Sequence, residues 1–184
     1  MRADARANHD RLLAVAGAVI TEQGVDASMR DIARQAGVGL ATLLRHFPAR
    51  EALLEALLRT NFDELTARAA EVESTSPPGD ALRLWLRDFV TCTANYRGVV
   101  TSMMQAIEDP ESALHNSCVT MRAAGTRLLS RAQDANLARA DLDGADLFAL
   151  ASALTWLGDQ PGLETRADHL FEVIVSAILT DHAG

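Results

Sequence analysis

Histidines, cysteines and carboxylates are the residues of this 184-residue chain whose chemistry would suit catalysis or metal binding. The five histidines, at positions 9, 46, 115, 169 and 182, show no His-x-x-x-His spacing, and no Cys-x-x-Cys pair accompanies them. The acidic run from Asp141 to Asp146 resembles a calcium loop, but its glycine is misplaced and Ser152 stands where the closing glutamate belongs. Gly-x-Ser-x-Gly, P-loop and Gly-rich dinucleotide patterns are missing. We therefore expect no catalytic residue, no metal and no cofactor.

Two cysteines, Cys92 and Cys118, leave one redox possibility open. They would form a thiol switch if their helices face each other, whereas buried inert thiols are the more ordinary arrangement. The polar N-terminus lacks the apolar core of a secretory signal. The longest apolar stretches, 147–157 and 170–179, fall well short of the roughly 18 residues that span a bilayer. We expect a cytoplasmic protein without a membrane anchor.

Composition and apolar spacing predict an all-α protein of about nine helices. Only 4% of the residues are aromatic, while alanine, leucine and arginine are abundant, which suits helices. Leu12, Ala16 and Ile20 repeat with a helical period and indicate a first helix over about 9–23, ended by Gly24. The remaining helices are expected over 28–36, 40–47, 50 to about 73, 80–96, 99–107, 114–133, 143 or 144 to 157, and 165–179.

Two of these expected helices are short and flank a glycine turn. Ser28 is placed to cap the first of them, and Gly37 is the residue best able to adopt the positive φ of a tight turn. Six apolar positions can face inward together: Ile32, Ala33, Ala36, Val38, Leu43 and Phe47. The residues that then face largely outward are Ala41, Thr42, Leu44 and Arg45. The pattern predicts a helix-turn-helix, whose second helix enters the major groove of DNA.

Charge is distributed as such a motif would require. The net charge of −8 taken alone argues against a nucleic-acid binder. Residues 1–50, however, contain seven arginines against five acidic residues, while residues 51–184 contain ten against twenty. A mildly basic head on a strongly acidic body directs only one end of the molecule toward phosphates.

Within the first 60 or so residues, one ungapped pattern comprises Ser28, Ile32-Ala33, Ala36-Gly37-Val38, Thr42-Leu43, His46-Phe47 and Glu51-Ala52-Leu53. By this pattern the chain resembles the tetracycline-repressor (TetR) family of bacterial regulators. Three positions depart from the family pattern, with Ala41 for glycine, Leu44 for tyrosine and Arg50 for lysine. The resemblance implies a helix-turn-helix DNA-binding domain over 1–50 and a support helix that continues to about 73. It also implies a helical effector-binding and dimerisation domain over 51–184.

The resemblance further implies which residues contact DNA. The base-facing side would consist of Leu40, Ala41, Leu44 and Arg45, with Arg30 reaching in from the preceding helix. Phosphates would be held by Ser28, Thr42, His46 and Arg50. Plainer readings stay open for His46, as a side chain packed against the support helix, and for Arg45, as a solvated charge. With so few polar base readers, we expect specificity to depend on Arg30, Arg45 and DNA shape.

A second set of expectations concerns the body. One helix-turn-helix makes too few base contacts for useful specificity, so a dimer on two half-sites is expected. The last two helices are the best candidates for the interface, through Leu147, Leu150, Leu154, Leu157, Leu170, Ile174 and Ile178. The alternative is that these apolar stripes pack only within their own subunit.

In the TetR family the region before those helices surrounds an effector pocket. The large or adaptable apolar residues here that would line it are Trp85, Phe89, Met103, Met104, Met121 and Trp156, the last of which would otherwise lie at the dimer seam. Plain core packing is the alternative for each of them. The overall expectation is a homodimeric, non-enzymatic repressor that binds a palindromic DNA operator and is released by an unknown small apolar effector. The alternative is a constitutive or redox-tuned repressor that needs no effector.

Overall fold

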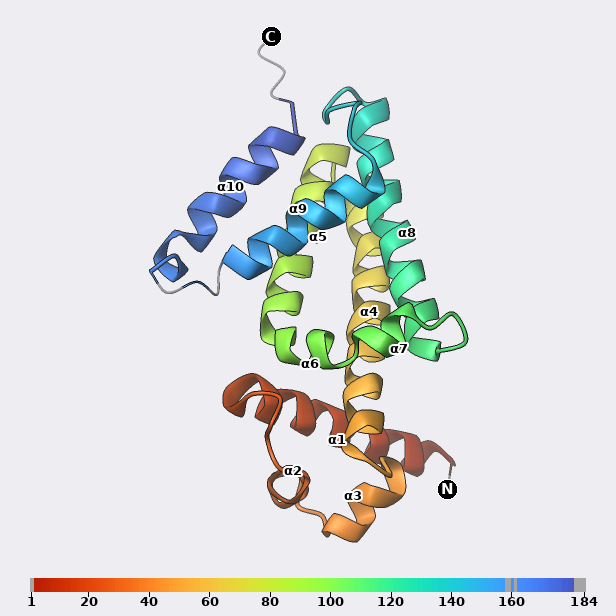
Figure 1. Ribbon diagram of the computed structural model, residues 1–184. Helices are drawn as coiled ribbons and strands as arrows, with labels where there is room; N and C mark the ends of the chain where they lie inside the picture. Colours follow the sequence, from red (N-terminus) through yellow and green to blue (C-terminus); the bar gives the residue numbers. More distant parts are fainter. Residues whose placement is uncertain (1, 158–159, 161, 181–184) are drawn as a thin grey trace. The chain divides into compact units, whose positions relative to one another are not determined.

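The computed structural model describes residues 2–157, 160 and 162–180, and within them the chain is helical (Figure 1). The helices are α1 (Arg2–Gln23), α2 (Met29–Gln35), α3 (Leu40–His46), α4 (Arg50–Thr75), α5 (Pro78–Asn95), α6 (Arg97–Ser102), α7 (Met104–Glu108), α8 (Ala113–Asp134), α9 (Gly144–Leu157), the 3₁₀ helix η1 (Glu164–Arg166) and α10 (Ala167–Ile178). The only β pairing in this part of the chain is an isolated antiparallel bridge between Ala138 and Leu179. The all-α prediction is confirmed.

The chain divides into two compact units. The head unit contains the residues up to 60 together with 96–115, and the body unit contains 61–95 together with 116 onward. The helices α4 and α8 therefore contribute residues to both units. This division by compactness differs from the predicted boundary at residue 50, because α6 and α7 belong to the same unit as the N-terminal helices.

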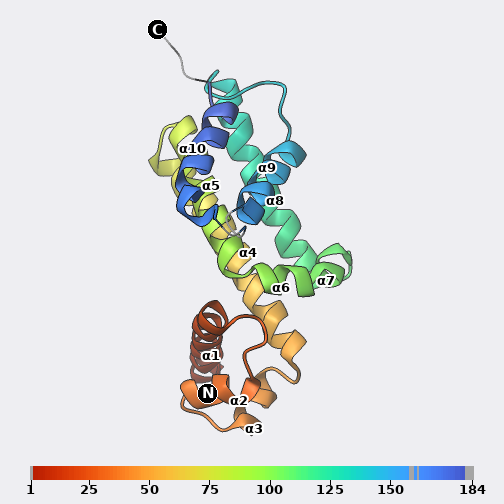
Figure 2. The same cartoon turned by 60° about the vertical axis from the view of Figure 1, so that its left-hand side comes forward.

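In the head unit, α1, α2 and α3 gather at the first turns of α4 (Figure 2). Leu12, Ala16 and Ile20 of α1 are buried, as their spacing predicted. The helix begins earlier than predicted, at Arg2, because the alanine-rich and arginine-rich start favours a helix without any apolar repeat. It ends at Gly24, whose φ of +86° is readily accessible to glycine alone.

One predicted helix of the head unit, over 99–107, is in fact two. The backbone at Met103, with φ −106° and ψ 9°, leaves the α conformation and separates α6 from α7. Just before α6, the Tyr96 hydroxyl lies against α1 at Gly17, where an added Cβ would come within 2.7 Å of the hydroxyl oxygen. The absence of a side chain at Gly17 therefore allows this close approach.

The body unit has an aromatic centre on α5. Trp85 is fully buried, and its indole N–H donates to the carbonyl oxygen of Leu65 at 2.8 Å. The ring centroids of Phe89 and Phe148 lie 5.6 and 6.0 Å from that of Trp85. Gly125 of α8 makes room for the indole, because a Cβ at that position would lie 2.5 Å from it. This packing joins α5, α8 and α9 within the unit.

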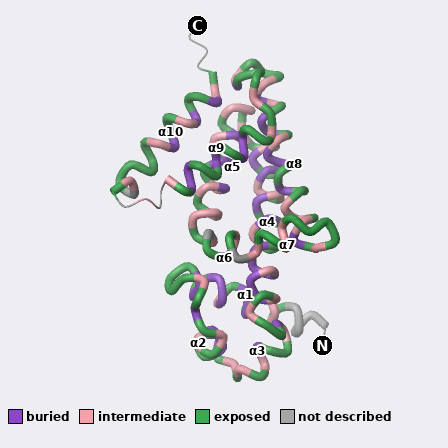
Figure 3. Tube along the Cα trace, in the orientation of Figure 1, coloured by how far each residue is buried: buried purple, intermediate pink, exposed green. Residues whose placement is uncertain are grey.

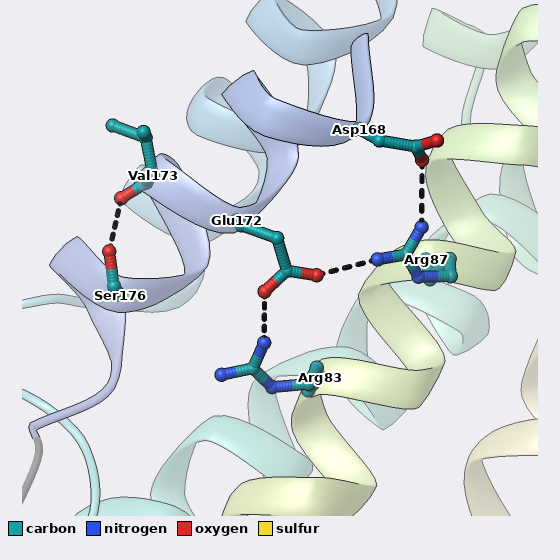
Figure 4. A network of polar contacts seen from close by, with 6 residues as sticks. All are labelled: Arg83, Arg87, Asp168, Glu172, Val173 and Ser176. Atoms are coloured by element: carbon teal, nitrogen blue, oxygen red, sulfur yellow. Dashed lines mark hydrogen bonds and ion pairs between the residues drawn. The ribbon is translucent and has the colours of Figure 1, made fainter.

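Charged side chains hold α10 against α5 (Figure 4). Glu172 accepts from Arg83 and, at 2.6 Å, from Arg87, which also reaches Asp168 at 3.1 Å. The Arg87 guanidinium also lies 4.2 Å from the centroid of the Phe171 ring, so Arg87 contacts α10 through a cation–π contact as well as through ion pairs. Because these groups are substantially exposed, the network orients α10 more than it stabilises the fold.

Candidate nucleic-acid interface

The helix α2 begins with a side-chain cap. Ser28 Oγ accepts from the backbone N–H of Asp31 at 3.0 Å and donates to the Asp31 carboxylate at 2.6 Å. The hydrogen bond from Ser28 lowers the pKa of Asp31, and Arg34 adds to the effect. A negative carboxylate in the first turn also suits the helix dipole. The capping role predicted for Ser28 is thus present, and its predicted phosphate contact stays a prediction.

The turn between α2 and α3 is a Schellman motif. The N–H of Val38 donates to the carbonyl oxygen of Ala33, and that of Gly37 donates to Arg34. Gly37 has a φ of +66°, as the sequence predicted, and nothing lies within 4 Å of where its Cβ would stand. The requirement for glycine is therefore conformational and does not come from crowding.

The inner face of the helix-turn-helix follows the predicted pattern. Ile32, Ala33, Ala36, Leu43 and Phe47 are all buried, and Val38 is half-buried. These contacts fix α3 by its Leu43 side, so the opposite side of the helix is directed outward. That outward side carries the candidate base readers.

The exposure of the candidate DNA contacts falls into two groups. Ser28, Arg30, Ala41, Leu44 and Arg45 are exposed, while Leu40, Thr42, His46 and Arg50 are half-buried. Arg45 donates to the Thr42 hydroxyl at 3.0 Å, which holds the arginine along the surface of α3. Leu44 exposes 38% of its surface, enough for apolar contact with a base.

Arg50 is engaged inside the head unit. Its guanidinium donates to the carbonyl oxygens of Val25, Asp26 and Ala27, the segment that joins α1 to α2. A lysine would present a point charge there, whereas the planar fork of arginine can bind several carbonyls at once. The predicted phosphate contact of Arg50 stays a prediction, and its position at the loop is an additional role that the sequence did not indicate.

Three residues of α1 that no sequence pattern indicated lie against the helix-turn-helix. Asn8 lies 3.2 Å from the ring of His46, Arg11 donates to the Ala36 carbonyl at 2.9 Å, and the ring of His9 packs 4.8 Å from that of Phe47. Asn8 and Arg11 also bond to each other at 2.9 Å. The contacts from α1 to Ala36, His46 and Phe47 join residues 25 to 38 positions apart, so no local spacing pattern marks them.

The predicted effector-pocket residues lie in different units. Trp85, Phe89 and Met121 are buried in the body unit, whereas Met103 and Met104 belong to the head unit. Trp156 of α9 exposes 60% of its surface. Phe148 joins the buried aromatic residues and was not predicted.

The predicted dimer residues also divide. Leu147, Leu154 and Ile178 are buried within the body unit, while Leu150, Leu157, Leu170 and Ile174 are only half-buried. Buried, half-buried and exposed positions follow one another along both helices (Figure 3). Exposed apolar residues of α9 and α10 include Ala149, Ala153, Trp156, Val173 and Ala177. The apolar stripes therefore serve both the subunit core and its surface.

The two cysteine thiols are poorly suited to redox chemistry. Burial raises the pKa of Cys92 to about 11, with a further contribution from Glu64, and burial also raises the pKa of Cys118. Within the described residues, no three His, Cys, Asp or Glu side chains are grouped to hold a metal ion. A search of the same part of the chain finds no helix with the length and apolarity to cross a membrane.

The helix α3 exposes one side, while buried residues of α2 and of α3 itself hold its other side beside the glycine turn. This arrangement is typical of a helix-turn-helix DNA-binding regulator. The chain matches the family model "Bacterial regulatory proteins, tetR family" over residues 12–57 and the model "Transcriptional regulator SbtR-like, C-terminal domain" over residues 77–178. The protein belongs to the TetR family of transcriptional regulators.

Known relatives agree with this assignment. A TetR transcriptional regulator of Streptomyces coelicolor is 30% identical, covers 94% of this chain and 99% of its own, and superposes with a TM-score of 0.76. A TetR regulator of Mycobacterium vanbaalenii is 31% identical, with 97% and 99% covered and a TM-score of 0.74. The transcriptional repressor KstR2 of Mycobacterium tuberculosis is 29% identical over 79% of this chain and 76% of its own. The family and these neighbours are transcriptional regulators, not enzymes.

Proposed function

We propose that this protein is a homodimeric repressor that reads a palindromic operator with α3 and is released by a small apolar effector. The observation that carries the proposal is the outward face of α3, where Ala41, Leu44 and Arg45 are exposed while Leu43 is buried. Small side chains at 39 and 41 allow the helix backbone to approach DNA closely. Arg45 can donate to guanine, and Leu44 can contact a thymine methyl group.

The residues proposed to contact DNA act in two ways. Arg45, Leu44, Ala41 and Leu40 read bases, helped by Arg30, while Ser28, Thr42 and Arg50 contact the phosphate backbone and His46 positions the end of α3 against it. Thr42 supports the proposal for Arg45, because the hydrogen bond between them aligns the guanidinium along the exposed face. Shape readout supplies the rest of the specificity.

Dimerisation is proposed to use the outward faces of α9 and α10. Trp156 and Val173 expose 60% and 48% of their surfaces, and the exposed Ala149 and Ala153 permit close helix approach. The half-buried Leu150, Leu157, Leu170 and Ile174 flank this face. A large aromatic side chain left in water at the edge of a body unit favours a second copy as its cover.

The proposed effector site is the aromatic centre of the body unit. The rings of Trp85, Phe89 and Phe148 pack together there, Met121 is buried in the same unit, and the indole N–H is already bonded to Leu65. A ligand that displaces part of this cluster gains apolar contacts and few hydrogen bonds, which favours an uncharged or weakly polar molecule. Its binding would shift the balance between DNA-binding and released conformations.

A repressor without an effector is the second candidate. Regulation of such a repressor by thiol oxidation is disfavoured by the raised pKa values of Cys92 and Cys118.

The experiment that tests the proposed function has two stages. The full-length protein is first used to select sequences from random duplex DNA, and a palindrome is expected. Neutral small molecules are then screened for a raised Tm and for release of the selected duplex. Recovery of no preferred sequence would contradict the DNA-binding proposal, and a screen without any hit would favour the effector-free repressor.

A further inference from the structure

A polar chain crosses the head unit from α2 to the last turn of α3. It runs from the Ala36 carbonyl oxygen to Arg11 at 2.9 Å, from Arg11 to the Asn8 amide oxygen at 2.9 Å, and from the Asn8 amide nitrogen to His46 Nε2 at 3.2 Å. Ala36 caps the C-terminal end of α2, and His46 is the last residue of α3. Two side chains of α1 therefore join both helices of the DNA-binding motif.

Arg11 determines which atoms donate and which accept in this series of hydrogen bonds. The Arg11 guanidinium can only donate, so the Asn8 atom that faces it must be the amide oxygen. The amide nitrogen of Asn8 is then the atom that faces His46, and it can only donate. His46 Nε2 must accept this hydrogen bond, which leaves the ring proton on Nδ1.

Packing beside the network limits how far the His46 ring can turn. The ring of His9, one residue after Asn8, lies 4.8 Å from that of the buried Phe47 and 5.9 Å from that of His46. The Phe47 side chain anchors the end of α3 in the head core. The orientation of His46 and the position of the last turn of α3 are therefore set together from α1.

We propose that Asn8, oriented by Arg11, is a positioning residue for DNA recognition that holds α3 through the Nδ1–H tautomer of His46. In this account His46 contributes to binding by fixing the recognition helix and not as an independent phosphate contact. Arg45, the proposed base reader, directly precedes His46 in α3. A small rotation of the last turn would therefore displace the Arg45 side chain. The inference rests on the proposed function of α3 in reading DNA.

The tautomer can be measured without DNA. Imidazole nitrogen chemical shifts in the full-length, nitrogen-15-labelled protein distinguish a protonated Nδ1 from a protonated Nε2. We expect the Nδ1–H form for His46 in the native protein. In Asn8→Asp the carboxylate can only accept, so the proton should move to Nε2. A native Nε2–H tautomer, or one that Asn8→Asp leaves unchanged, would overturn the proposal.

A double-mutant cycle tests the function of the pair. Affinity for a duplex selected by the native protein is measured for Asn8→Leu, His46→Leu and the double variant. Each single change is expected to weaken binding about three- to tenfold, as for the loss of one hydrogen bond. The double variant should lose no more than either single one, because both remove the same contact. His46→Gln, whose amide oxygen can replace Nε2 as the acceptor, should restore most of the affinity.

The salt dependence separates positioning from phosphate contact. Loss of a phosphate contact lowers the salt slope by about one, whereas loss of positioning leaves it unchanged. A reduced slope in His46→Leu, or independent losses that multiply in the double variant, would overturn the proposal.

Ala7→Asp is the matched control for Asn8→Asp, because it adds the same charge at an exposed neighbouring position. Failure of the native protein to bind any duplex would instead count against the proposed function.

Discussion

Two arginines of the head unit illustrate how residues of one type differ in their roles. Arg45 is exposed on the outward side of α3 and donates to the hydroxyl of Thr42 in its own helix. Arg50 is half-buried and donates to carbonyl oxygens of the segment between α1 and α2. The first is placed to read bases, and the second holds the backbone from which α2 begins.

These positions predict different effects on DNA binding. Arg45→Ala should change which sequences are selected at one position of each half-site, because a bidentate contact to a base discriminates by about 1–3 kcal/mol. Arg50→Ala should weaken binding to all sequences alike and lower the salt slope by about one, because it also removes the phosphate contact proposed for Arg50. Selection from random DNA with each variant makes the comparison. An Arg45→Ala variant that selects the native sequence would exclude Arg45 as a base reader.

The cysteines give a prediction on pH dependence. The pKa of Cys92 is about 11 in the folded protein and the ordinary thiol value is 9.0, so the folded state binds the thiol proton more tightly. The stabilisation from the protonated thiol is complete below pH 9 and is lost as the pH rises toward 11. Alkylation of native Cys92 at neutral pH should accordingly be far slower than in the unfolded chain. Rapid alkylation of the native protein, with loss of DNA binding, would revive the redox-tuned alternative.

At the scale of elements, the helix-turn-helix could be predicted because its determinants are local. The cap at Ser28, the positive φ of Gly37 and the alternation of buried and exposed residues all lie within 20 consecutive positions. The bond between Asn8 and His46 spans 38 positions and depends on how two helices pack, so no local pattern predicts it. The break at Met103 also lacks a sequence signal, since neither glycine nor proline marks it.

The turn between α2 and α3 provides a matched pair of substitutions. Gly37→Ala should reduce the free energy of unfolding by about 1 kcal/mol, because an L-residue is strained at a φ of +66°. Gly39→Ala should be tolerated, since Gly39 has a φ of −70° and nothing within 4 Å of its added Cβ. Urea unfolding of both variants tests the prediction. Equal losses in the two variants would show that the turn conformation is not the source of the effect.

At the scale of the whole molecule, the final helices raise a problem that the sequence leaves open. The helix α9 is apolar over most of its circumference, so spacing alone does not distinguish the side packed within the subunit from the side available to a partner. Leu147 and Leu154 lie on the inner side, and Trp156 lies on the outer side. Both final helices form as predicted, and the residues predicted for the interface are either buried within the subunit or half-buried.

This arrangement predicts which exposed apolar residue dimerisation requires. Trp156→Asp should convert the proposed dimer to a monomer and weaken operator binding by at least tenfold, because a charge would be buried in the interface without a partner. Leu84→Asp is the control, since Leu84 of α5 is also a large apolar residue, 41% exposed. Sedimentation equilibrium gives the oligomeric state of each variant. A dimeric Trp156→Asp variant would place the interface elsewhere.

The most direct test of the central claim is the dependence of affinity on the spacing of two half-sites. Full-length protein is titrated with duplexes whose half-sites are about 10 base pairs apart, about 15 base pairs apart, or reduced to one. A dimer with two α3 helices in successive major grooves should bind the first duplex tightly. Both others should bind at least tenfold more weakly, since only one head can engage. Equal affinity for all three duplexes would contradict the account.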